Sequence, residues 1–345
     1  MTDPQNLTPL TSIGEFGLID RLTGQYSPSR ATTLRGIGDD AAVLAYGDKL
    51  TLVSTDLLIE GVHFDLTYYP LKHLGYKAVA VNLSDICAMC GTPEQITVSL
   101  ALSSRFSLEA IEELYSGIYQ ACQHYGVDLI GGDTTSSRIG LVISITVMGS
   151  ATSDEVVYRT GAGENDLICV SGDLGAAYAG LLILEREKAV FKADPNMQPE
   201  LEGLDYLLER QLKPEPRLDV VRLLKENGIK PTAMIDVSDG VASDIRHIAK
   251  SSDLGCVIYE DKLPIHQLTW DQLGIMKIDP TTAALNGGED YELLFTVAQA
   301  DFERIKALND ISIIGHMAPK EEGYYLISRS GTKAELKAQG WDALK

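Results

Sequence analysis

The sequence predicts a mixed α/β protein of two domains. Strand-like stretches alternate with helix-like stretches in both halves of the chain, which is typical of layered α/β folds. The chain has 345 residues, of which 45% are hydrophobic, enough for more than one core. Its composition turns polar and rich in glycine near residues 150–165. We therefore expect a first domain over 1–150 and a second over 151–345.

The first half shows both helical and strand periodicities. Residues 71–90 are unusually apolar for a helix, whereas 107–125 show an amphipathic period. Residues 141–148 are rich in β-branched side chains, which favour a strand. The expected order is helix 14–24, strands 42–45 and 50–54, helix 71–90, strand 95–102, helix 107–125, and strands 127–130 and 141–148.

The second half repeats the alternation, with residues 192–203 interpreted as a loop. The expected order is strand 167–170, helices 174–187, 203–211 and 216–227, strand 233–235, helix 240–251, and strands 256–260, 291–297 and 311–315. The stretch 129–133 resembles 285–289, which hints at related domains.

The charge of the chain excludes several partners. Its formal net charge is −20, from 49 acidic and 29 basic residues. Such a surface repels nucleic acid and anionic membranes, so we expect neither as a partner. No apolar run is long enough to span a bilayer, and no basic start followed by an apolar stretch indicates a signal peptide. Five scattered cysteines fit a reducing compartment, so we expect a cytoplasmic protein.

Acidic residues recur beside glycine, serine or threonine in six short clusters. These are GIGDD (36–40), STD (54–56), NLSD (82–85), GGDT (131–134), DVSDG (236–240) and GGED (287–290). Carboxylates in tight turns can converge if cations hold them, because like charges repel at short range. Mg²⁺ shared between carboxylate and phosphate is a way for an acidic protein to bind a polyphosphate.

Other nucleotide and metal motifs do not explain the chain. Residues 36–41 fit G-x-G-x-x-A, but two carboxylates stand where a pyrophosphate would bind, and no apolar strand precedes them. A P-loop, the protein-kinase signatures and H-E-x-x-H are missing from the sequence. Cys87 and Cys90 form a lone C-x-x-C, which we interpret as core packing.

Simpler structural roles remain open for several acidic residues. Asp85 lies in an apolar segment, where a carboxylate is costly unless it is paired or binds metal, so we favour a metal ligand over the alternative that Ser84 or Asp85 caps a new helical turn. Ser238 and Asp239 suit a helix N-cap, and the same position favours phosphate. His63 and Arg159 alone would be ordinary surface residues.

Taken in order, the motifs resemble those of the thiamine-monophosphate kinase family, within the aminoimidazole-ribonucleotide synthetase-like superfamily. The matching stretches are GIGDDAAVL (36–44), STD with GVHF (54–56, 61–64), YKAVAVNLSD (76–85), LIGGDTT (129–135), DVSDG with SDI (236–240, 243–245) and GGEDYEL (287–293). The likeness runs from about Gly14 to Gly340-Trp341-Asp342, while residues 186–203 match poorly.

The resemblance implies a two-domain PurM-like fold and a homodimer. Strands of the N-terminal domain would join those of a second subunit in a β-barrel, and a C-terminal α/β domain with a mixed sheet would fold over the nucleotide. It also implies ATP and thiamine monophosphate as substrates and several Mg²⁺ ions as cofactors. Because the acceptor is an anionic phosphate oxygen, with a second pKa of about 6, we expect no dedicated catalytic base.

The resemblance also implies a role for each matching residue. The implied metal ligands are Asp40, Ser54, Thr55, Asp56, Asp85, Asp133, Asp236 and Asp239. The implied ATP contacts are Gly132, Asp133, Arg159 and Ser238, and the implied substrate contacts are His63, Glu289 and Trp341.

Two other readings stay open at this level. One is a sister enzyme of the same superfamily: selenophosphate synthetase, hydrogenase-maturation dehydratase or a purine-pathway synthetase. Selenophosphate chemistry would call for a reactive N-terminal cysteine, but no cysteine precedes Cys87. The other is a non-catalytic protein that binds divalent ions. Calcium sites favour one contiguous loop, whereas these carboxylates are spread from Asp39 to Glu289.

Overall fold

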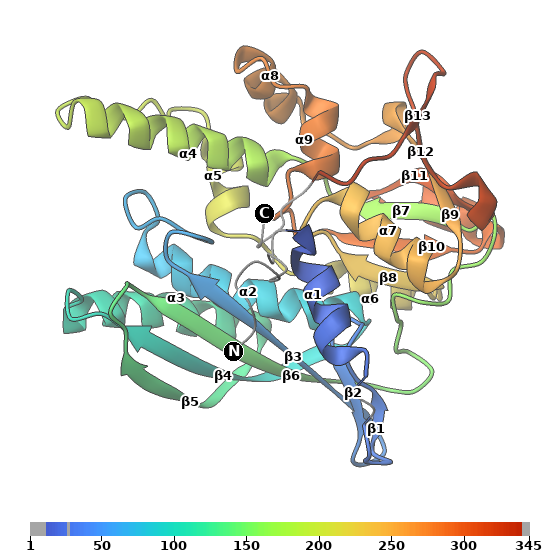
Figure 1. Cartoon of the computed structure of the whole chain (residues 1–345), viewed down its shortest axis with the longest axis horizontal. Coiled ribbons are helices and arrows are strands. Elements are labelled where there is room, and N and C mark those ends of the chain that lie inside the picture. The colour runs from blue at the N-terminus through green and yellow to red at the C-terminus, as the bar shows by residue number, and fades with distance from the viewer. Residues whose placement is uncertain (1–11, 26–27, 340–345) are drawn as a thin grey trace, which may run out of the picture.

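The computed structural model describes residues 12–25 and 28–339. Its strands form two sheets, one from each half of the chain (Figure 1). The six-stranded sheet has the order β1-β2-β3-β6-β4-β5, and the seven-stranded sheet has the order β13-β12-β9-β11-β7-β10-β8. Both sheets mix parallel and antiparallel pairs, with helices packed on them. The mixed α/β class expected from the sequence is therefore confirmed.

The first sheet is antiparallel except where β5 joins β4 in parallel. The parallel pair needs a crossover, and α3 provides it. The elements of this half are α1 (Gly14–Thr23), β1 (Thr33–Arg35), β2 (Ala42–Ala45), β3 (Leu50–Ile59), α2 (Leu71–Ala88), β4 (Thr92–Leu102), α3 (Leu108–Tyr125), β5 (Asp128–Ser136) and β6 (Val142–Ala151).

The second sheet has strands β7 (Leu167–Ser171), β8 (Ala233–Asp236), β9 (Gly255–Tyr259), β10 (Leu293–Val297), β11 (Ile311–Ala318), β12 (Tyr324–Ile327) and β13 (Lys333–Glu335). Its helices are α4 (Ala176–Ala193), α5 (Asp205–Leu212), α6 (Leu218–Glu226), α7 (Val241–Ser251), α8 (Gln267–Ile275), α9 (Pro280–Asn286) and α10 (Phe302–Lys306). A buried cluster around α7 lies on one part of this sheet, and another joins α6 and α10 to it. No helix among the described residues is long and apolar enough to cross a membrane.

Helix α2 joins the two halves. It contacts β3, β4 and β6 of the first sheet and also β8 of the second. Leu83 and Ile86 belong to the first core, whereas Cys87 and Ala88 pack with residues of the second half. A helix buried on nearly all sides is apolar all round, which explains its unusual composition.

Three expectations about individual elements were wrong. Strand β3 does not end before Thr55 but continues to Ile59, because β6 pairs with it along its whole length. Strand β5 likewise continues through Gly131 and Gly132 to Ser136, since β4 supplies a partner for each residue from Gly131 onward. Helix α4 extends to Ala193 instead of ending near 187.

Some short elements were not expected at all. Strands β1, β12 and β13 and helices α8, α9 and α10 fall in stretches where no element was predicted. All six have only three to nine residues, too few for a clear helical or strand period.

Helices α2 and α3 approach each other closely through glycine. A Cβ atom on Gly117 of α3 would lie 1.8 Å from the Lys72 carbonyl oxygen, and one on Gly75 of α2 would lie 2.0 Å from the Leu114 carbonyl oxygen. Both obstacles are backbone atoms, which cannot move aside as a flexible side chain would. The close contact fixes the position of α2, and with it the residues that α2 presents to the junction between the sheets.

We expect Gly117→Ala to destabilise the protein by about 1–3 kcal/mol, because the added methyl group forces the two helices apart. Gly274→Ala in α8 is the matched control, since nothing lies within 4 Å of its Cβ position. That change should be neutral or stabilise by up to about 1 kcal/mol through helix propensity. Chemical denaturation measures both free energies of unfolding, and equal values would contradict the proposed close packing.

Candidate active site

The motif residues meet at a large cavity at the junction of the two halves. Its volume is about 1270 Å³, and its lining includes side chains of α2, α4 and α9, of β3 and the loops next to β2 and β3, and of the segment before α7. Of the residues singled out from the sequence, it is lined by Asp40, Ser54, Asp56, His63, Asp85, Arg159, Asp236, Ser238, Asp239 and Glu289. Folding therefore brings motifs that are far apart in the sequence together around one cavity.

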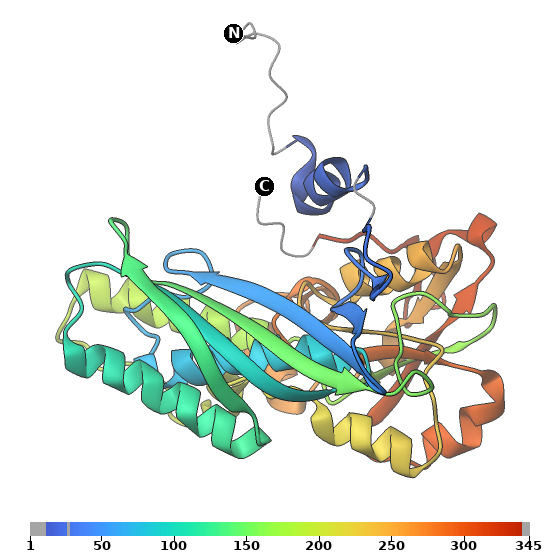
Figure 2. The same ribbon diagram turned by 90° about the horizontal axis from the view of Figure 1, so that it is seen from below.

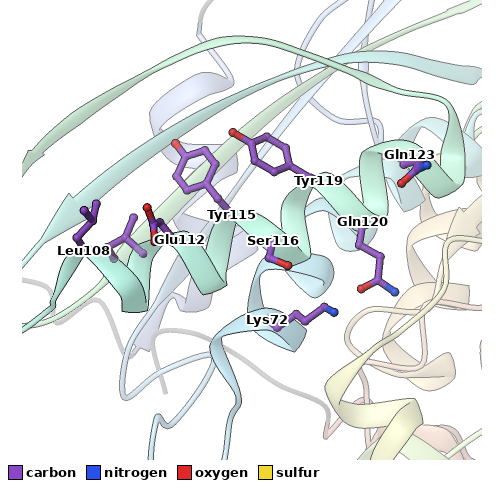
Figure 3. A pocket seen from close by; sticks show the side chains of 9 residues that line it. Lys72, Leu108, Glu112, Tyr115, Ser116, Tyr119, Gln120 and Gln123 are labelled. Atoms are coloured by element: carbon purple, nitrogen blue, oxygen red, sulfur yellow. The ribbon is translucent and has the colours of Figure 1, made fainter.

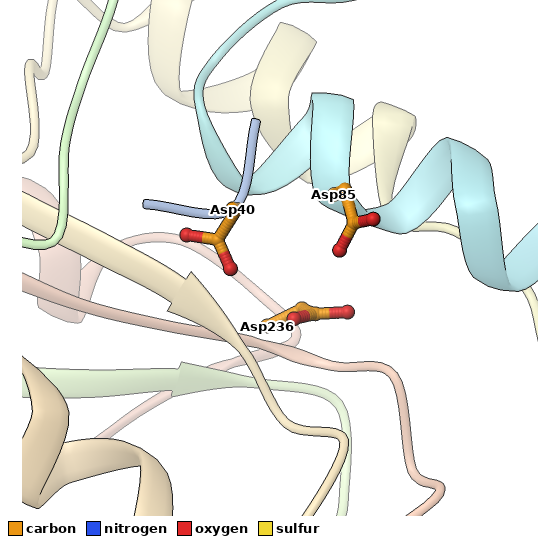
Figure 4. Close-up of side chains that lie close together, drawn as sticks. All are labelled: Asp40, Asp85 and Asp236. Atoms are coloured by element: carbon orange, nitrogen blue, oxygen red, sulfur yellow. The ribbon is translucent and has the colours of Figure 1, made fainter. Parts of the chain in front are cut away.

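Three of the aspartates that line this cavity lie close together (Figure 4). Asp40 precedes β2, Asp85 lies in the last turns of α2, and Asp236 ends β8. Each contributes a carboxylate oxygen, and these oxygens all lie within 4.8 Å of one another. Asp40 and Asp236 are only 6% and 4% exposed. This separation suits a cation coordinated by oxygen ligands.

Serine hydroxyls orient two of these carboxylates. Ser54 Oγ donates to Asp85 Oδ2 at 2.5 Å, and Ser84 Oγ donates to Asp236 Oδ2 at 2.6 Å. In the NLSD motif, Asp85 is therefore a member of the cluster, and Ser84 hydrogen-bonds to another member, Asp236. Asp85 does not cap a new helix, because α2 runs through it without a break.

Arg159 balances the charge of Asp40. Its Nη2 donates to Asp40 Oδ1 at 2.7 Å and its Nε donates to Oδ2 at 3.1 Å. Its backbone N–H also donates to Asp39 Oδ1 at 3.0 Å. Burial opposes the charged guanidinium, but Asp40 outweighs it and raises the pKa of Arg159. A bidentate pair of this kind fixes both side chains at the edge of the cluster.

Burial and mutual repulsion raise the pKa values of the other carboxylates at the site. Burial, with Asp40 as the next cause, raises the pKa of Asp236 to about 7. Burial, followed by Glu15, raises the pKa of Asp56 to about 6. Burial and the neighbouring Asp56 raise the pKa of Asp85 well above its usual value. These protein groups alone favour partial protonation, and a bound cation would favour the ionised forms. The donor set therefore fits a hard divalent cation such as Mg²⁺.

The DVSDG and GGED motifs form one connected wall of the cavity. Ser238 and Asp239 precede α7, and the backbone N–H of Glu289 donates to the Ser238 carbonyl oxygen at 2.8 Å. The N-terminus of α7 is capped from within, because Asp244 Oδ2 accepts from Gly240 N at 3.1 Å. This arrangement places a helix N-terminus, which favours anions, beside the carboxylate cluster.

Glu289 and His63 line the same cavity and have hydrogen-bond partners outside the carboxylate cluster. Glu289 Oε1 lies 2.8 Å from Lys77 Nζ, and its Oε2 accepts from Gln211 Nε2 at 2.7 Å. His63 Nδ1 accepts from Ile59 N at 3.0 Å, which leaves Nε2 as the protonated nitrogen of a neutral ring. Burial lowers the pKa of His63, although Glu289 acts in the opposite direction. These two residues thus combine a carboxylate with a neutral imidazole.

Three predicted site residues do not reach the cavity of a single chain. Thr55 Oγ1 donates to the Ile145 carbonyl oxygen at 3.0 Å, on an exposed position of β3. Gly132 and Asp133 lie on the edge strand β5, and Asp133 pairs with Ser99 in β4. Their assigned roles therefore stay predictions. Trp341 lies outside the described residues.

Asp133 faces away from the cluster. The register aligns it in one row with Ser99, Ser144 and Leu57. Successive side chains of a strand alternate between the two faces, so this row lies on the face opposite to Asp56. The sequence did not reveal this, because spacing within β5 gives no information about the pairing of β3 with β6.

Sequence reasoning did not assign a role to several residues at the cavity. Glu15, Tyr68, Glu185 and Gln211 line it, and Lys77 supports Glu289 from behind. The sequence does carry a signal for Lys77, since a lysine in the middle of an apolar helix needs a buried partner. The others come from stretches without a distinctive local pattern.

A second hollow, of about 750 Å³, lies along α3 near the start of α2 (Figure 3). It is lined by Lys72, Leu108, Ile111, Glu112, Tyr115, Ser116, Tyr119, Gln120 and Gln123. None of the residues singled out from the motifs lines it, so the junction cavity remains the candidate active site.

Comparisons with known proteins show which proteins this chain resembles. Residues 38–151 match the family model described as AIR synthase related protein, N-terminal domain, and residues 163–327 match the corresponding C-terminal domain. Hydrogenase maturation protein HypE in complex with ATP shares the fold, with a TM-score of 0.69 over 98% of this chain and all of that chain at 19% identity.

Closer likenesses extend over nearly the whole chain. Thiamine-monophosphate kinase of Bacillus subtilis is 36% identical over 339 residues, covering 96% of this chain and 99% of that protein. The Escherichia coli K12 enzyme is 36% identical over 338 residues, covering 95% and 98%. A solved structure of AaThiL complexed with AMPPCP and TMP has a TM-score of 0.82 at 32% identity, covering 98% of this chain and 99% of that chain. The resemblance that the motifs indicated is confirmed, and the chain belongs to the thiamine-monophosphate kinase family, whose members are phosphotransferases.

Proposed function

We propose that this protein transfers the terminal phosphoryl group of ATP to thiamine monophosphate and so forms thiamine diphosphate. The observation that carries the proposal is the convergence of Asp40, Asp85 and Asp236 in a cavity that also contains Glu289 and His63. One region offers oxygen ligands for a cation that would accompany a polyphosphate. The other offers a carboxylate for a positively charged thiazolium ring.

Several Mg²⁺ ions would be held by the carboxylate cluster, with Asp56, Ser54 and Asp239 as further oxygen donors at the same cavity. When bound, Mg²⁺ would neutralise phosphate charge as it develops during transfer. Asp133 and Thr55 would join these metal ligands only if a site included the face of the first sheet that lies opposite to α2.

The chain's own residues bind and orient the two substrates. Arg159, held at the edge of the cluster by Asp40, supplies positive charge for the nucleotide phosphates. Ser238 lies next to the N-terminus of α7, where positive potential favours a phosphate group. The acceptor phosphate is anionic near neutral pH, so in-line attack requires no protein base. This agrees with the neutral imidazole of His63, which suits a binding role.

Glu289 and His63 would contact the thiamine part of the substrate. A carboxylate attracts the permanent positive charge of thiazolium, and an aromatic face such as that of Trp341 would add a cation–π contact. The lining aromatic residues Tyr68 and Tyr291 add apolar surface in the same cavity.

We also propose a homodimer formed through the first sheet. Among the described residues, no helix crosses the face of this sheet that lies opposite to α2 (Figure 2). That face carries Asp133 and also Leu57, which is 48% exposed. A second subunit on this face would cover the apolar surface and form the barrel that the family resemblance implies. The molar mass in solution tests this arrangement.

A phosphorylation assay with MgATP tests the proposed function. We expect ADP and thiamine diphosphate to form with thiamine monophosphate as the acceptor. Selenide and purine-pathway ribonucleotides serve as the comparison substrates for the sister enzymes. ATP consumption with one of these, and none with thiamine monophosphate, would overturn the proposal. A protein that binds divalent ions but no nucleotide in calorimetry would support the non-catalytic alternative.

Asp85→Asn should lower kcat/KM by at least about 100-fold, because the amide cannot replace an anionic ligand at the centre of the cluster. The fold should be retained, since Asn keeps the shape of the side chain. The matched control is Asp253→Asn, an exposed carboxylate paired with Lys320 away from the cavity. Steady-state kinetics and thermal unfolding measure both variants. Full activity of Asp85→Asn would show that this carboxylate does not bind metal.

The stability of the metal-free protein should fall as the pH rises from about 5.5 to 8. The folded pKa of Asp236, about 7, lies above its ordinary value of 3.8. The folded state therefore binds more protons in this range, and the stabilisation is lost as the pH passes the folded pKa. Mg²⁺ should restore stability at the higher pH by a few degrees, because it binds the ionised form.

Thermal unfolding with Mg²⁺ or with a chelator at both pH values measures this effect. Asp236→Asn should reduce both the pH dependence and the Mg²⁺ effect. If Mg²⁺ raised the melting temperature of Asp236→Asn as much as that of the original protein, Asp236 would not be a ligand.

A further inference from the structure

Lys77 is a buried cation on α2 that lies behind Glu289. Its side chain is only 1% exposed, which is rare for lysine unless it has a partner. The ammonium group lies 2.8 Å from Glu289 Oε1 and donates to the Gln211 carbonyl oxygen at 3.4 Å. It also lies 5.6 Å from the centre of the Tyr69 ring. Lys77 thus connects α2 to two segments of the second half.

Glu289 is held from behind in an unusual conformation. Its backbone has φ +57°, a region that residues other than glycine seldom adopt. Hydrogen bonds from Glu289 N to Ser238 O and from Tyr291 N to Val237 O hold this turn in place. Lys77 binds one carboxylate oxygen and Gln211 binds the other. The side chain is therefore fixed in both position and orientation.

The two partners differ in their access to the cavity. The side chain of Glu289 is 28% exposed and lines the cavity, whereas Lys77 does not line it. Any effect of Lys77 on a ligand in the cavity therefore passes through Glu289. His63 is sensitive to the same pair, because Glu289 and Lys77 shift its pKa in opposite directions.

We propose that Lys77 is a positioning residue for the acceptor substrate, which acts by holding the Glu289 carboxylate toward the cavity. This inference rests on the proposed function, in which Glu289 contacts the cationic organic part of the acceptor. A carboxylate that must meet a fixed positive charge works best when its orientation is set before binding, because no ordering cost is then incurred. The effect belongs to acceptor binding, because the nucleotide would bind at the carboxylate cluster.

A purely structural role for Lys77 makes a different prediction. Lys77 joins α2 to Gln211 and Glu289, so its loss would loosen the junction as a whole. The carboxylate cluster also lies at this junction, and Asp85 is on the same helix. A structural role would therefore weaken nucleotide and acceptor binding together and lower the melting temperature in proportion.

The test is a double-mutant cycle with Lys77→Met, Glu289→Gln and the combined variant. Methionine matches the length of the lysine stem and is apolar, so it fits the buried position. We expect Lys77→Met to raise KM for thiamine monophosphate by about tenfold or more, with kcat and KM for ATP changed less than about threefold. The combined variant should have the same KM for thiamine monophosphate as Glu289→Gln alone.

Lys72→Met is the matched control, because it makes the same change on an exposed position of α2. It should leave both KM values unchanged. If Lys77→Met does not fold, the comparison of Glu289→Gln with the combined variant still decides. In Glu289→Gln the amide oxygen can still accept a hydrogen bond from Lys77, and the combined variant carries neither charge. A combined variant with a clearly higher acceptor KM than Glu289→Gln would overturn the inference, as would a parallel rise of both KM values in Lys77→Met.

The assay of the original protein separates this inference from the proposed function. If the unaltered protein does not phosphorylate thiamine monophosphate, the proposed function fails. If it does and Lys77→Met shows an unchanged acceptor KM, the function stands and the positioning role of Lys77 is wrong.

Discussion

Repulsion between buried carboxylates is the constraint on which the rest of the site depends. Asp40, Asp85 and Asp236 come from three distant segments, yet their oxygens lie within 4.8 Å of one another. Such an arrangement is unfavourable unless hydrogen bonds, a guanidinium or a metal ion offset the charge. The structure supplies two of these compensations itself, through the serine hydroxyls and Arg159. The third is the role proposed for Mg²⁺.

Helix α2 is the structural element that makes this convergence possible. It packs against α3 through glycine on one side and reaches the second sheet on the other. From this single helix come Asp85, the serine that binds Asp236, and Lys77, which supports Glu289. The carboxylate cluster and the proposed acceptor region are thus both positioned by helix α2. This is a simple way to keep two substrates in a constant relation.

The sequence predicted the fold class and most long elements because their hydrophobic periods are clear. Helix α3 and strand β6 are examples, since each buries one regular face. It also indicated which carboxylates could converge, because the motifs occur in a family-specific order. It did not reveal that β3 continues past Thr55, nor that Asp133 faces away from Asp56. Both depend on strand pairing between segments that are distant in the sequence, β3 with β6 above all, which local patterns do not encode.

The ion pair between Arg159 and Asp40 also affects the protein without any bound ligand. An arginine keeps its charge at every pH that a folded protein survives, so it acts as a permanent internal counter-ion. Part of the repulsion within the site is thereby relieved without help from solution. The junction between the two halves can then stay assembled without a bound cation, so the loss of the proposed Mg²⁺ would stop the activity and leave the fold in place.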